Sequence, residues 1–211
     1  MRAIVVRHYR TLCNATDRIM GWADSPIADD GYSGIEYVAH RLQELDIEID
    51  AVYSSTLERS RNSARYFADR FGLDRVHDCA ELSEVNYGQL SHRSKKWVAR
   101  HVPEYKRDPD FVFPQGESFR RMQRRSVEFC YRLAETHADQ TLLMVLHAGV
   151  IRGLVSDILG LDYAQQLRRK VSHQYIGEFL FEGRRCRRYD ELGKESGFVT
   201  DGVVKLPRTC V

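Results

Sequence analysis

The strongest strand signal in the chain is the apolar run TLLMVLH at 141–147, and a helical pattern follows it without a gap. An unbroken apolar run of this kind is typical of a strand buried on both faces of a parallel sheet. The next segment, AGVIRGLVSDILG, repeats apolar residues at helical spacing, at Val150, Ile151, Leu154, Val155 and Ile158. A strand followed directly by a helix is the repeating unit of a parallel sheet, so this region favours an α/β fold.

The same alternation recurs along the chain. Residues 2–7 and 51–55 are further strand candidates, and QYIGEFLFEGRRCRRYD predicts one or two strands with a turn around Glu182 and Gly183. Apolar residues at helical spacing predict helices after Asp30, from near Thr56 to Gly72, and from about Glu117 to His137. The expected fold is therefore an α/β fold, with a mostly parallel central sheet flanked by helices on both faces.

Length and composition restrict the class of protein. A chain of 211 residues that is 43% hydrophobic can build one large core, and we expect a single domain over residues 1–211. The net charge of +2 disfavours nucleic acid as a partner. Neither a secretory signal nor an 18-residue apolar stretch is recognised, so we expect no membrane association and a cytoplasmic location. The five scattered cysteines predict reduced thiols rather than a disulfide framework or a zinc site.

Basic side chains follow the predicted strands where ligands bind in such folds. His8 and His147 each come directly after an apolar strand, and ligands of open α/β sheets bind beyond the carboxyl ends of the strands. Arg59 lies in the first turn of the helix after the second strand, where free backbone N–H groups already favour an anion. Together with Arg7 these residues predict a phosphate pocket.

The residue types suggest how such a pocket could cleave a phosphate ester. Arginine matches phosphate oxygens bidentately, so Arg7 and Arg59 are candidate clamps. Neighbouring cations lower the pKa of a histidine, which would leave His8 neutral and able to attack phosphorus. Positive charge of this kind stabilises the transferring group without a metal or cofactor. The leaving alkoxide still needs a proton, and Glu84 in ELSEVNYGQL is the candidate donor.

An ordered set of motifs also resembles a known family. The segments are Arg7-His8, Asn14, GWADSPIADDG at 21–31, SSTLERSRNSA at 54–64, LSEVNYG at 82–88, PQGES at 114–118 and LHAGVIR at 146–152. Their conjunction resembles branch 1 of the histidine phosphatase superfamily, the phosphoglycerate mutase-like family. The resemblance implies a phosphorylated nucleophile at His8 and a proton donor at Glu84. It implies phosphate ligands at Arg7, Asn14, Arg59 and His147, and a substrate side shaped by Met20, Gly21 and the segment from Glu84 to Ser118.

The chain departs from the family pattern directly after the nucleophile. Tyr9 and Arg10 stand where the family usually has Gly and then Glu or Gln, and a ring at position 9 could narrow the pocket. Cys13 replaces a common tryptophan, and Ala148 replaces the glycine that often follows the second histidine.

The sequence alone does not decide what the other clusters of basic residues contact. The cluster FRRMQRRS at 119–126 is interpreted as a solvated helix face, whereas Lys95 and Lys96 could contact substrate or solvent.

Rival catalytic classes find less support. No cysteine is followed six positions later by arginine, as a cysteine phosphatase requires, and no close cluster of histidines and carboxylates predicts a metal site. The sequence therefore predicts a metal-independent phosphatase acting on a small phosphorylated metabolite, with inorganic phosphate as the other ligand. Two alternatives stay open: a cofactor-dependent mutase, disfavoured by the short segment from Gln89 to Phe113, and a noncatalytic phospholigand-binding protein. The sequence also leaves open whether the protein forms a homo-oligomer.

Overall fold

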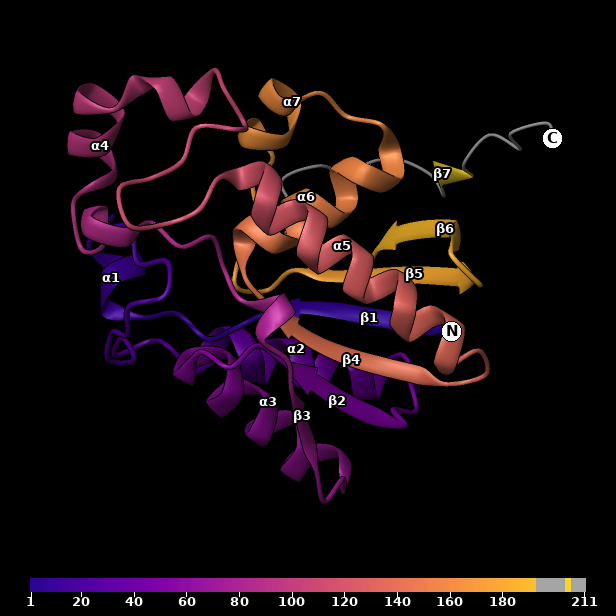
Figure 1. The fold of residues 1–211 in the computed structure, drawn as a ribbon. Coiled ribbons are helices and arrows are strands. Elements are labelled where there is room, and N and C mark those ends of the chain that lie inside the picture. The colour runs from indigo at the N-terminus through magenta and orange to yellow at the C-terminus, as the bar shows by residue number, and fades with distance from the viewer. Residues whose placement is uncertain (193–203, 206–211) are drawn as a thin grey trace, which may run out of the picture.

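A single seven-stranded sheet forms the centre of the computed structural model, which describes residues 1–192 and 204–205 (Figure 1). The strand order is β3-β2-β4-β1-β5-β6-β7. The strands are β1 (Arg2–Arg7), β2 (Ala51–Ser54), β3 (Val76–Asp78), β4 (Thr141–Leu146), β5 (Ile176–Glu182), β6 (Arg185–Glu191) and β7 (Val204–Lys205).

The sheet combines a parallel half with an antiparallel half. β1, β4, β2 and β3 run parallel to their neighbours, whereas β5 pairs antiparallel with β1, and β6 with β5. Arg7 at the end of β1 pairs with Leu146 at the end of β4. Because the two central strands end at the same level, the residues that follow them, His8 and His147, emerge next to each other.

Helices cover both faces of the sheet, as predicted. In Figure 1, α2 and α3 lie on one face, and α5 and α6 on the other. The helices are α1 (Leu12–Ala15), α2 (Ser33–Glu44), α3 (Glu58–Phe71), α4 (Lys95–His101), α5 (Phe119–Thr136), α6 (Ala148–Leu159) and α7 (Tyr163–Arg168).

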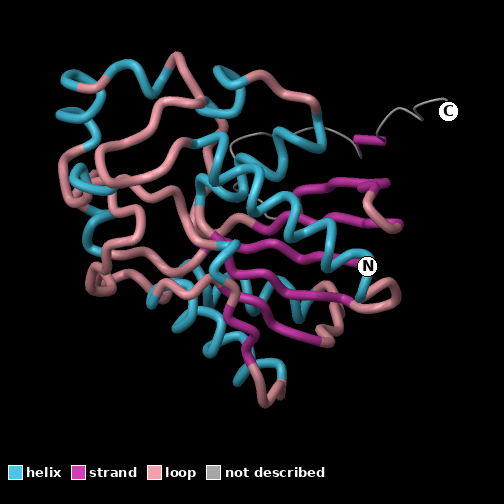
Figure 2. The backbone as a smooth tube through the Cα atoms, in the orientation of Figure 1, coloured by secondary structure: helices cyan, strands magenta, loops and turns pink. Residues whose placement is uncertain are grey.

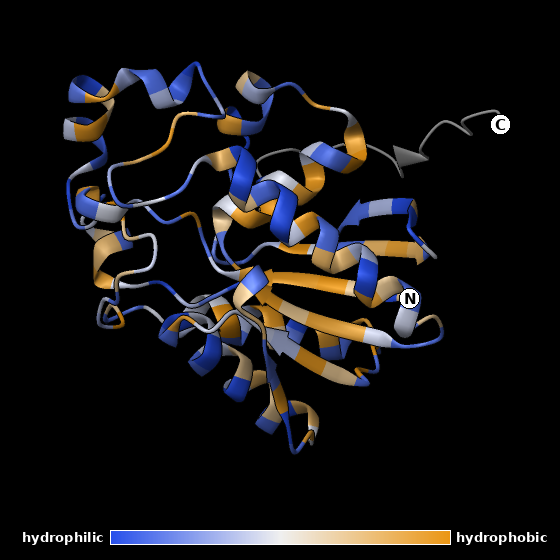
Figure 3. Cartoon of the chain, in the orientation of Figure 1, coloured by the Kyte–Doolittle hydropathy of each residue, from blue (hydrophilic) through white to orange (hydrophobic). Residues whose placement is uncertain are grey.

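The apolar strand runs reflect these two covered faces. On β1, Ile4 and Val6 pack in the core beneath α2 and α3, and Ala3 and Val5 pack in the core beneath α5 and α6. Successive side chains of a strand point to opposite faces, so a strand buried on both sides must be apolar throughout. Figure 3 shows the central strands as the most hydrophobic part of the chain.

Local signals fix where elements begin and end. The Ser118 side chain accepts a hydrogen bond from the Arg121 backbone N–H and caps the N-terminus of α5. Gly72 ends α3 in the left-handed conformation at φ 69°, and Gly183 turns the β5–β6 hairpin at φ 53°.

The predicted elements are present, with shifts of a residue or two at their ends. α3 begins at Glu58 rather than near Thr56. Periodicity did not predict β3, α4 or α7, because β3 has three residues and the two helices have seven and six.

Loops, together with α1, α4 and α7, gather beyond the carboxyl ends of the parallel strands (Figure 2). Among the helices that the structure describes, none combines the length and the hydrophobicity that a membrane span needs. The four described cysteines are free thiols, and Cys210 lies outside the described residues.

Candidate active site

A cavity of about 470 Å³ opens where the parallel strands end. The predicted site residues in its lining are Arg7, His8, Asn14, Arg59 and Glu84. His147 lies just behind the wall, with its ring centroid 5.0 Å from that of His8. The structure thus brings together side chains from β1, α1, α3, the loop after β3 and the start of α6.

His8 is held in a single tautomer at the end of β1. Its side chain is buried, and Nδ1 lies 2.6 Å from the Tyr9 carbonyl oxygen. A carbonyl oxygen only accepts hydrogen bonds, so Nδ1 carries the proton. The lone pair of the neutral ring therefore resides on Nε2.

Burial and neighbouring charge keep His8 neutral. Burial is the main cause that lowers its pKa well below the usual 6.5, and the Arg59 guanidinium is the next. His147 and Arg7 lower the pKa further. The ring is therefore unprotonated, and able to act as a nucleophile, at neutral pH.

His147 is the N-cap residue of α6, so its ring stands at the positive end of a twelve-residue helix. Nε2 lies 2.7 Å from the Ser55 hydroxyl, and the buried Nδ1 has no hydrogen-bond partner. Burial, then Arg59, lowers the pKa of His147. Because this ring nitrogen lies beside His8 and has no protein partner, it is suited to bind an oxygen of the transferring phosphate.

Arg59 and Arg7 are oriented by backbone carbonyls rather than by carboxylates. Arg59 Nη2 donates to the Gly21 carbonyl at 2.6 Å, and Arg7 Nη1 donates to the Val171 carbonyl at 2.6 Å. In each guanidinium the buried Nε has no partner. Burial is the main cause that lowers the pKa of Arg7 to about 9 and that of Arg59 to about 10, so both stay charged at neutral pH.

Asn14 completes the phosphate side of the cavity. Its Oδ1 accepts hydrogen bonds from the Thr11 backbone N–H and hydroxyl, at 3.2 and 3.0 Å. This arrangement leaves the amide nitrogen of Asn14 as a donor for a ligand.

Glu84 reaches the cavity from the loop that follows β3. One carboxylate oxygen, Oε2, accepts from the Gly149 backbone N–H at 3.0 Å, and Oε1 accepts from the Val85 N–H at 3.0 Å. A Cβ at position 149 would stand only 2.1 Å from Oε1. Glycine is therefore required at this place in α6 for the carboxylate to reach the helix N-terminus.

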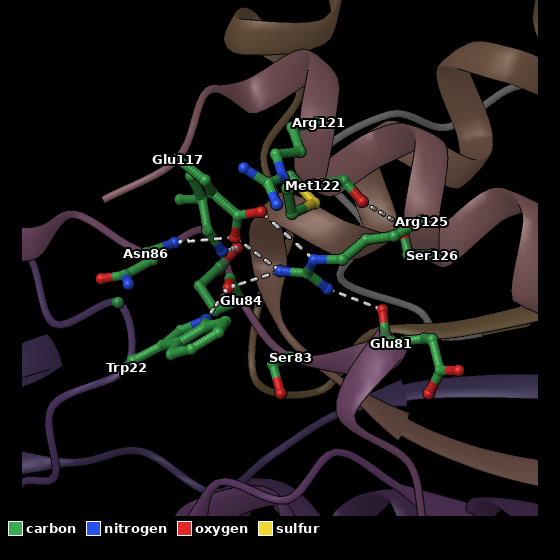
Figure 4. A network of polar contacts seen from close by, with 12 residues as sticks. Trp22, Glu81, Ser83, Glu84, Asn86, Glu117, Arg121, Met122, Arg125 and Ser126 are labelled. Carbon is green, nitrogen blue, oxygen red and sulfur yellow. Dashed lines mark hydrogen bonds and ion pairs between the residues drawn. The ribbon is translucent and has the colours of Figure 1, made fainter. Parts of the chain in front are cut away.

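A polar network holds the Glu84 backbone (Figure 4). The Glu84 carbonyl accepts from Trp22 Nε1 at 2.6 Å and from Arg125 Nη2 at 3.0 Å. Arg125 also donates to the Glu81 carbonyl and forms an ion pair with buried Glu117 at 2.7 Å. Arg125 therefore links α5 to the loop that carries Glu84.

The sequence did not single out Arg125, because we interpreted the cluster at 119–126 as a solvated helix face. Arg121 and Arg124 are indeed exposed, but Arg125 is half-buried. Its position one residue before buried Ser126 and three after buried Met122 is the signal that could have identified it.

The structure also places Tyr9 and the pair Lys95 and Lys96, whose contacts the sequence left open. Tyr9 is absent from the cavity lining, and its buried ring packs against Tyr32 with centroids 5.8 Å apart. The ring therefore does not narrow the pocket. Lys95 lines the cavity, as do Met20 and Gly21, whereas Lys96 does not.

The chain is similar in sequence to known phosphoglycerate mutases. A 2,3-bisphosphoglycerate-dependent phosphoglycerate mutase from Brucella melitensis biotype 2 is 26% identical over 179 residues, which cover 80% of this chain and 86% of the mutase. The same mutase from Brucella abortus strain S19 is also 26% identical, with the same coverage.

Solved structures share the fold. A putative alpha-ribazole-5'-P phosphatase from Escherichia coli superposes with a TM-score of 0.79 at 23% identity, and covers 93% of this chain and 97% of the phosphatase. The alpha-ribazole phosphatase from Shigella flexneri has a TM-score of 0.75 at 25% identity. The match covers 88% of this chain and 93% of the phosphatase.

The family prediction is confirmed by a family model that matches residues 3–189. The expectation of an enzyme of the phosphomonoesterase type is confirmed with it. The chain belongs to branch 1 of the histidine phosphatase superfamily.

Proposed function

We propose that this protein is a phosphatase that hydrolyses small phosphomonoesters through a phosphohistidine on His8, with Glu84 as the proton donor and without a metal ion. The observation that carries the proposal is the state of His8: a neutral ring whose Nδ1 is bound to the Tyr9 carbonyl, leaving Nε2 free in a cationic cavity. A binding protein would need neither a nucleophile in this state nor a carboxylate opposite it.

In the first step Nε2 of His8 attacks phosphorus, the N–P bond forms and the ester P–O bond breaks. Arg7, Arg59, Asn14 and His147 hold the phosphate oxygens during the transfer. Glu84, entering as the carboxylic acid, gives its proton to the leaving alkoxide, which departs as the alcohol.

The second step reverses these roles. The Glu84 carboxylate takes a proton from a water molecule, whose oxygen attacks phosphorus. The N–P bond breaks, its electron pair returns to Nε2, and inorganic phosphate leaves. Glu84 is protonated again, so the enzyme is ready for the next ester.

The decisive experiment is rapid quenching of the working enzyme with a ³²P-labelled aryl phosphate. We expect an acid-labile adduct on His8 of the unaltered chain, and none on a folded His8→Ala variant. The variant should release phosphate at least about a thousandfold more slowly, because the covalent route is lost. Undiminished turnover by His8→Ala would contradict the proposal, and chelator treatment should leave the rate unchanged.

A mutase is the second candidate, favoured by the mutase relatives and by Lys95 in the cavity wall. The same purified protein distinguishes the two. Isomerisation of 3-phosphoglycerate that is stimulated by 2,3-bisphosphoglycerate and exceeds phosphate release would replace the phosphatase assignment with the mutase.

A further inference from the structure

The backbone carbonyl of Tyr9 decides which ring nitrogen of His8 is able to attack phosphorus. His8 Nδ1 lies 2.6 Å from this carbonyl oxygen, so the proton stays on Nδ1 and the lone pair on Nε2. If the carbonyl turned away, the proton would be free to move to Nε2, and a ring in that tautomer has no lone pair there with which to attack. The nucleophile therefore depends on the orientation of the Tyr9 backbone.

The peptide bond between His8 and Tyr9 is held from both sides. On one side the Tyr9 N–H donates to the Ser63 hydroxyl oxygen at 2.9 Å. That hydroxyl donates its own proton to the Arg59 carbonyl at 2.7 Å, so its oxygen is left to accept. Ser63 is fully buried on α3. The contact thus joins the backbone beside the nucleophile to the helix that supplies a phosphate clamp.

On the other side the His173 ring holds the carbonyl of the same peptide bond. Nδ1 of His173 lies 2.8 Å from the His8 carbonyl oxygen, and the two ring centroids are 5.6 Å apart. Burial above all lowers the pKa of His173 to about 3, so this ring is neutral and its Nδ1–H is the donor. Gly34 of α2 packs closely on His173, since a Cβ at position 34 would stand 3.0 Å from the His173 carbonyl oxygen. The donor is therefore held in place by α2.

The neighbouring parts of the chain are fixed as well. The His8 N–H donates to the Leu146 carbonyl at 3.1 Å, which continues the pairing of β1 with β4. The Tyr9 ring is buried and packs against Tyr32. Because the peptide bond and the ring that follows it are both held, the Tyr9 carbonyl stays directed at His8 Nδ1.

We propose that Ser63 and His173 are positioning residues of the reaction, which keep the His8 ring in its attacking tautomer by fixing the peptide bond between His8 and Tyr9. The inference rests on the proposed function and adds two residues to it. Both side chains lie outside the described lining of the cavity, so they act through His8 and not on the substrate. Losing either contact should slow the attack on phosphorus while the phosphate ligands stay in place.

The tautomer of His8 is measured by NMR on protein labelled with ¹⁵N-histidine, because the ring nitrogen with the proton and the one with the lone pair differ in chemical shift. The His8 signals are assigned by their absence from His8→Ala. We expect the unaltered chain to carry the His8 proton on Nδ1, and Ser63→Ala and His173→Leu to shift both signals toward the Nε2–H form. A proton on Nε2 in the unaltered chain would overturn the inference.

The rate of phosphohistidine formation is the second measurement. In a single-turnover rapid quench with a ³²P-labelled aryl phosphate, Ser63→Ala and His173→Leu should each form the adduct on His8 about tenfold or more slowly. The inhibition constant of inorganic phosphate should change by less than about twofold, because the side chains that hold the phosphate are unaltered.

Conservative variants separate positioning from a merely structural role. In His173→Asn the amide nitrogen takes the place of Nδ1 and still donates to the His8 carbonyl, so tautomer and rate should match those of the unaltered chain. Ser63→Thr keeps the hydroxyl and should behave likewise. Ser126→Ala removes another buried hydroxyl, which donates to carbonyls of its own helix, α5, and should alter neither measurement.

The outcomes separate this inference from the function on which it rests. An unaltered chain that forms no adduct on His8 would reject the phosphatase itself. If the adduct forms, and Ser63→Ala and His173→Leu keep the tautomer and the rate, the positioning role alone is rejected. Equal slowing by His173→Asn and His173→Leu would reject it too, since the donor would then not matter. Should His173→Leu not fold, the comparison of Ser63→Ala with Ser63→Thr decides in the same way.

Discussion

At the scale of single residues, the missing side chain of Gly149 decides where the candidate proton donor lies. The Gly149 N–H donates to Glu84 Oε2, and there is no room for a Cβ beside Oε1. Gly149 is the second residue of α6, and glycine stabilises a helix less than alanine does, so a glycine here indicates close approach rather than helix stability.

Gly149→Ala should therefore displace the Glu84 carboxylate while α6 stays folded. We expect kcat on an alkyl phosphate to fall by about tenfold or more, with a smaller loss on an aryl phosphate, whose leaving group needs less protonation. Glu84→Gln should show the same selective loss, to a greater degree. Steady-state rates on the matched pair of esters measure both.

Gly153→Ala is the control on the same helix, because its added Cβ would meet Gln123 at Cγ (3.1 Å), Cβ (3.3 Å) and Cα (3.6 Å), and not the Glu84 carboxylate. It should leave both rates within about twofold. Equal losses on alkyl and aryl esters in Gly149→Ala would contradict a role in placing the proton donor.

At the scale of elements, α5 supports the site through Arg125. The guanidinium reaches two carbonyls of the loop after β3, those of Glu81 and Glu84, and is neutralised by Glu117 (Figure 4). A helix that packs on the sheet thus fixes a loop that has little regular structure of its own.

Arg125→Met should release that loop and leave the buried Glu117 carboxylate without a cation, with the Asn86 backbone N–H as its remaining donor. We expect the free energy of unfolding to fall by about 3 kcal/mol. We also expect alkyl phosphate hydrolysis to slow more than aryl phosphate hydrolysis. Urea unfolding and the two ester rates measure these effects.

The double variant Arg125→Met with Glu117→Gln should recover stability, since no charge is left unpaired, without recovering the alkyl ester rate. Arg124→Met, an exposed neighbour on α5, should change neither quantity. If the double variant recovered both, Arg125 would be a purely structural residue.

The sequence predicted the elements whose pattern is long and regular. The buried strands around His8 and His147 and the helices after them produce clear periodicity, so the place where β1 and β4 end, and with it the candidate site, could be predicted. Tyr9 and Arg125 could not, because their roles depend on partners far away in the sequence. Tyr9 packs against Tyr32, and Arg125 binds a carbonyl 41 residues earlier.

At the scale of the whole molecule, three buried or half-buried histidines are held neutral around the cavity. His173 Nδ1 donates to the His8 carbonyl at 2.8 Å, and burial is the main cause that lowers the pKa of His173 to about 3. The pKa values of His8 and His147 are also well below 6.5. In the unfolded chain each histidine takes up a proton near pH 6.5, so acid favours unfolding.

Stability should therefore be highest above pH 6.5 and fall as the pH decreases below it. Each histidine that stays neutral in the folded state contributes a loss of about 1.4 kcal/mol per pH unit. Urea unfolding at several pH values between 7.5 and 5.0 measures the slope. His173→Asn should reduce it by one histidine's share, and an identical slope in His173→Asn would contradict this assignment.

Trp22 is an intrinsic fluorescent probe close to the candidate proton donor. Its indole is 48% exposed and is tied to the backbone of Glu84 beside the cavity. The chain has only one other tryptophan, Trp97 on α4, where the ring stacks on His101. Replacing Trp97 with phenylalanine would leave a single tryptophan, hydrogen-bonded to the backbone of the candidate proton donor, so ligand binding that moves this loop could be followed by tryptophan emission in real time with no attached dye.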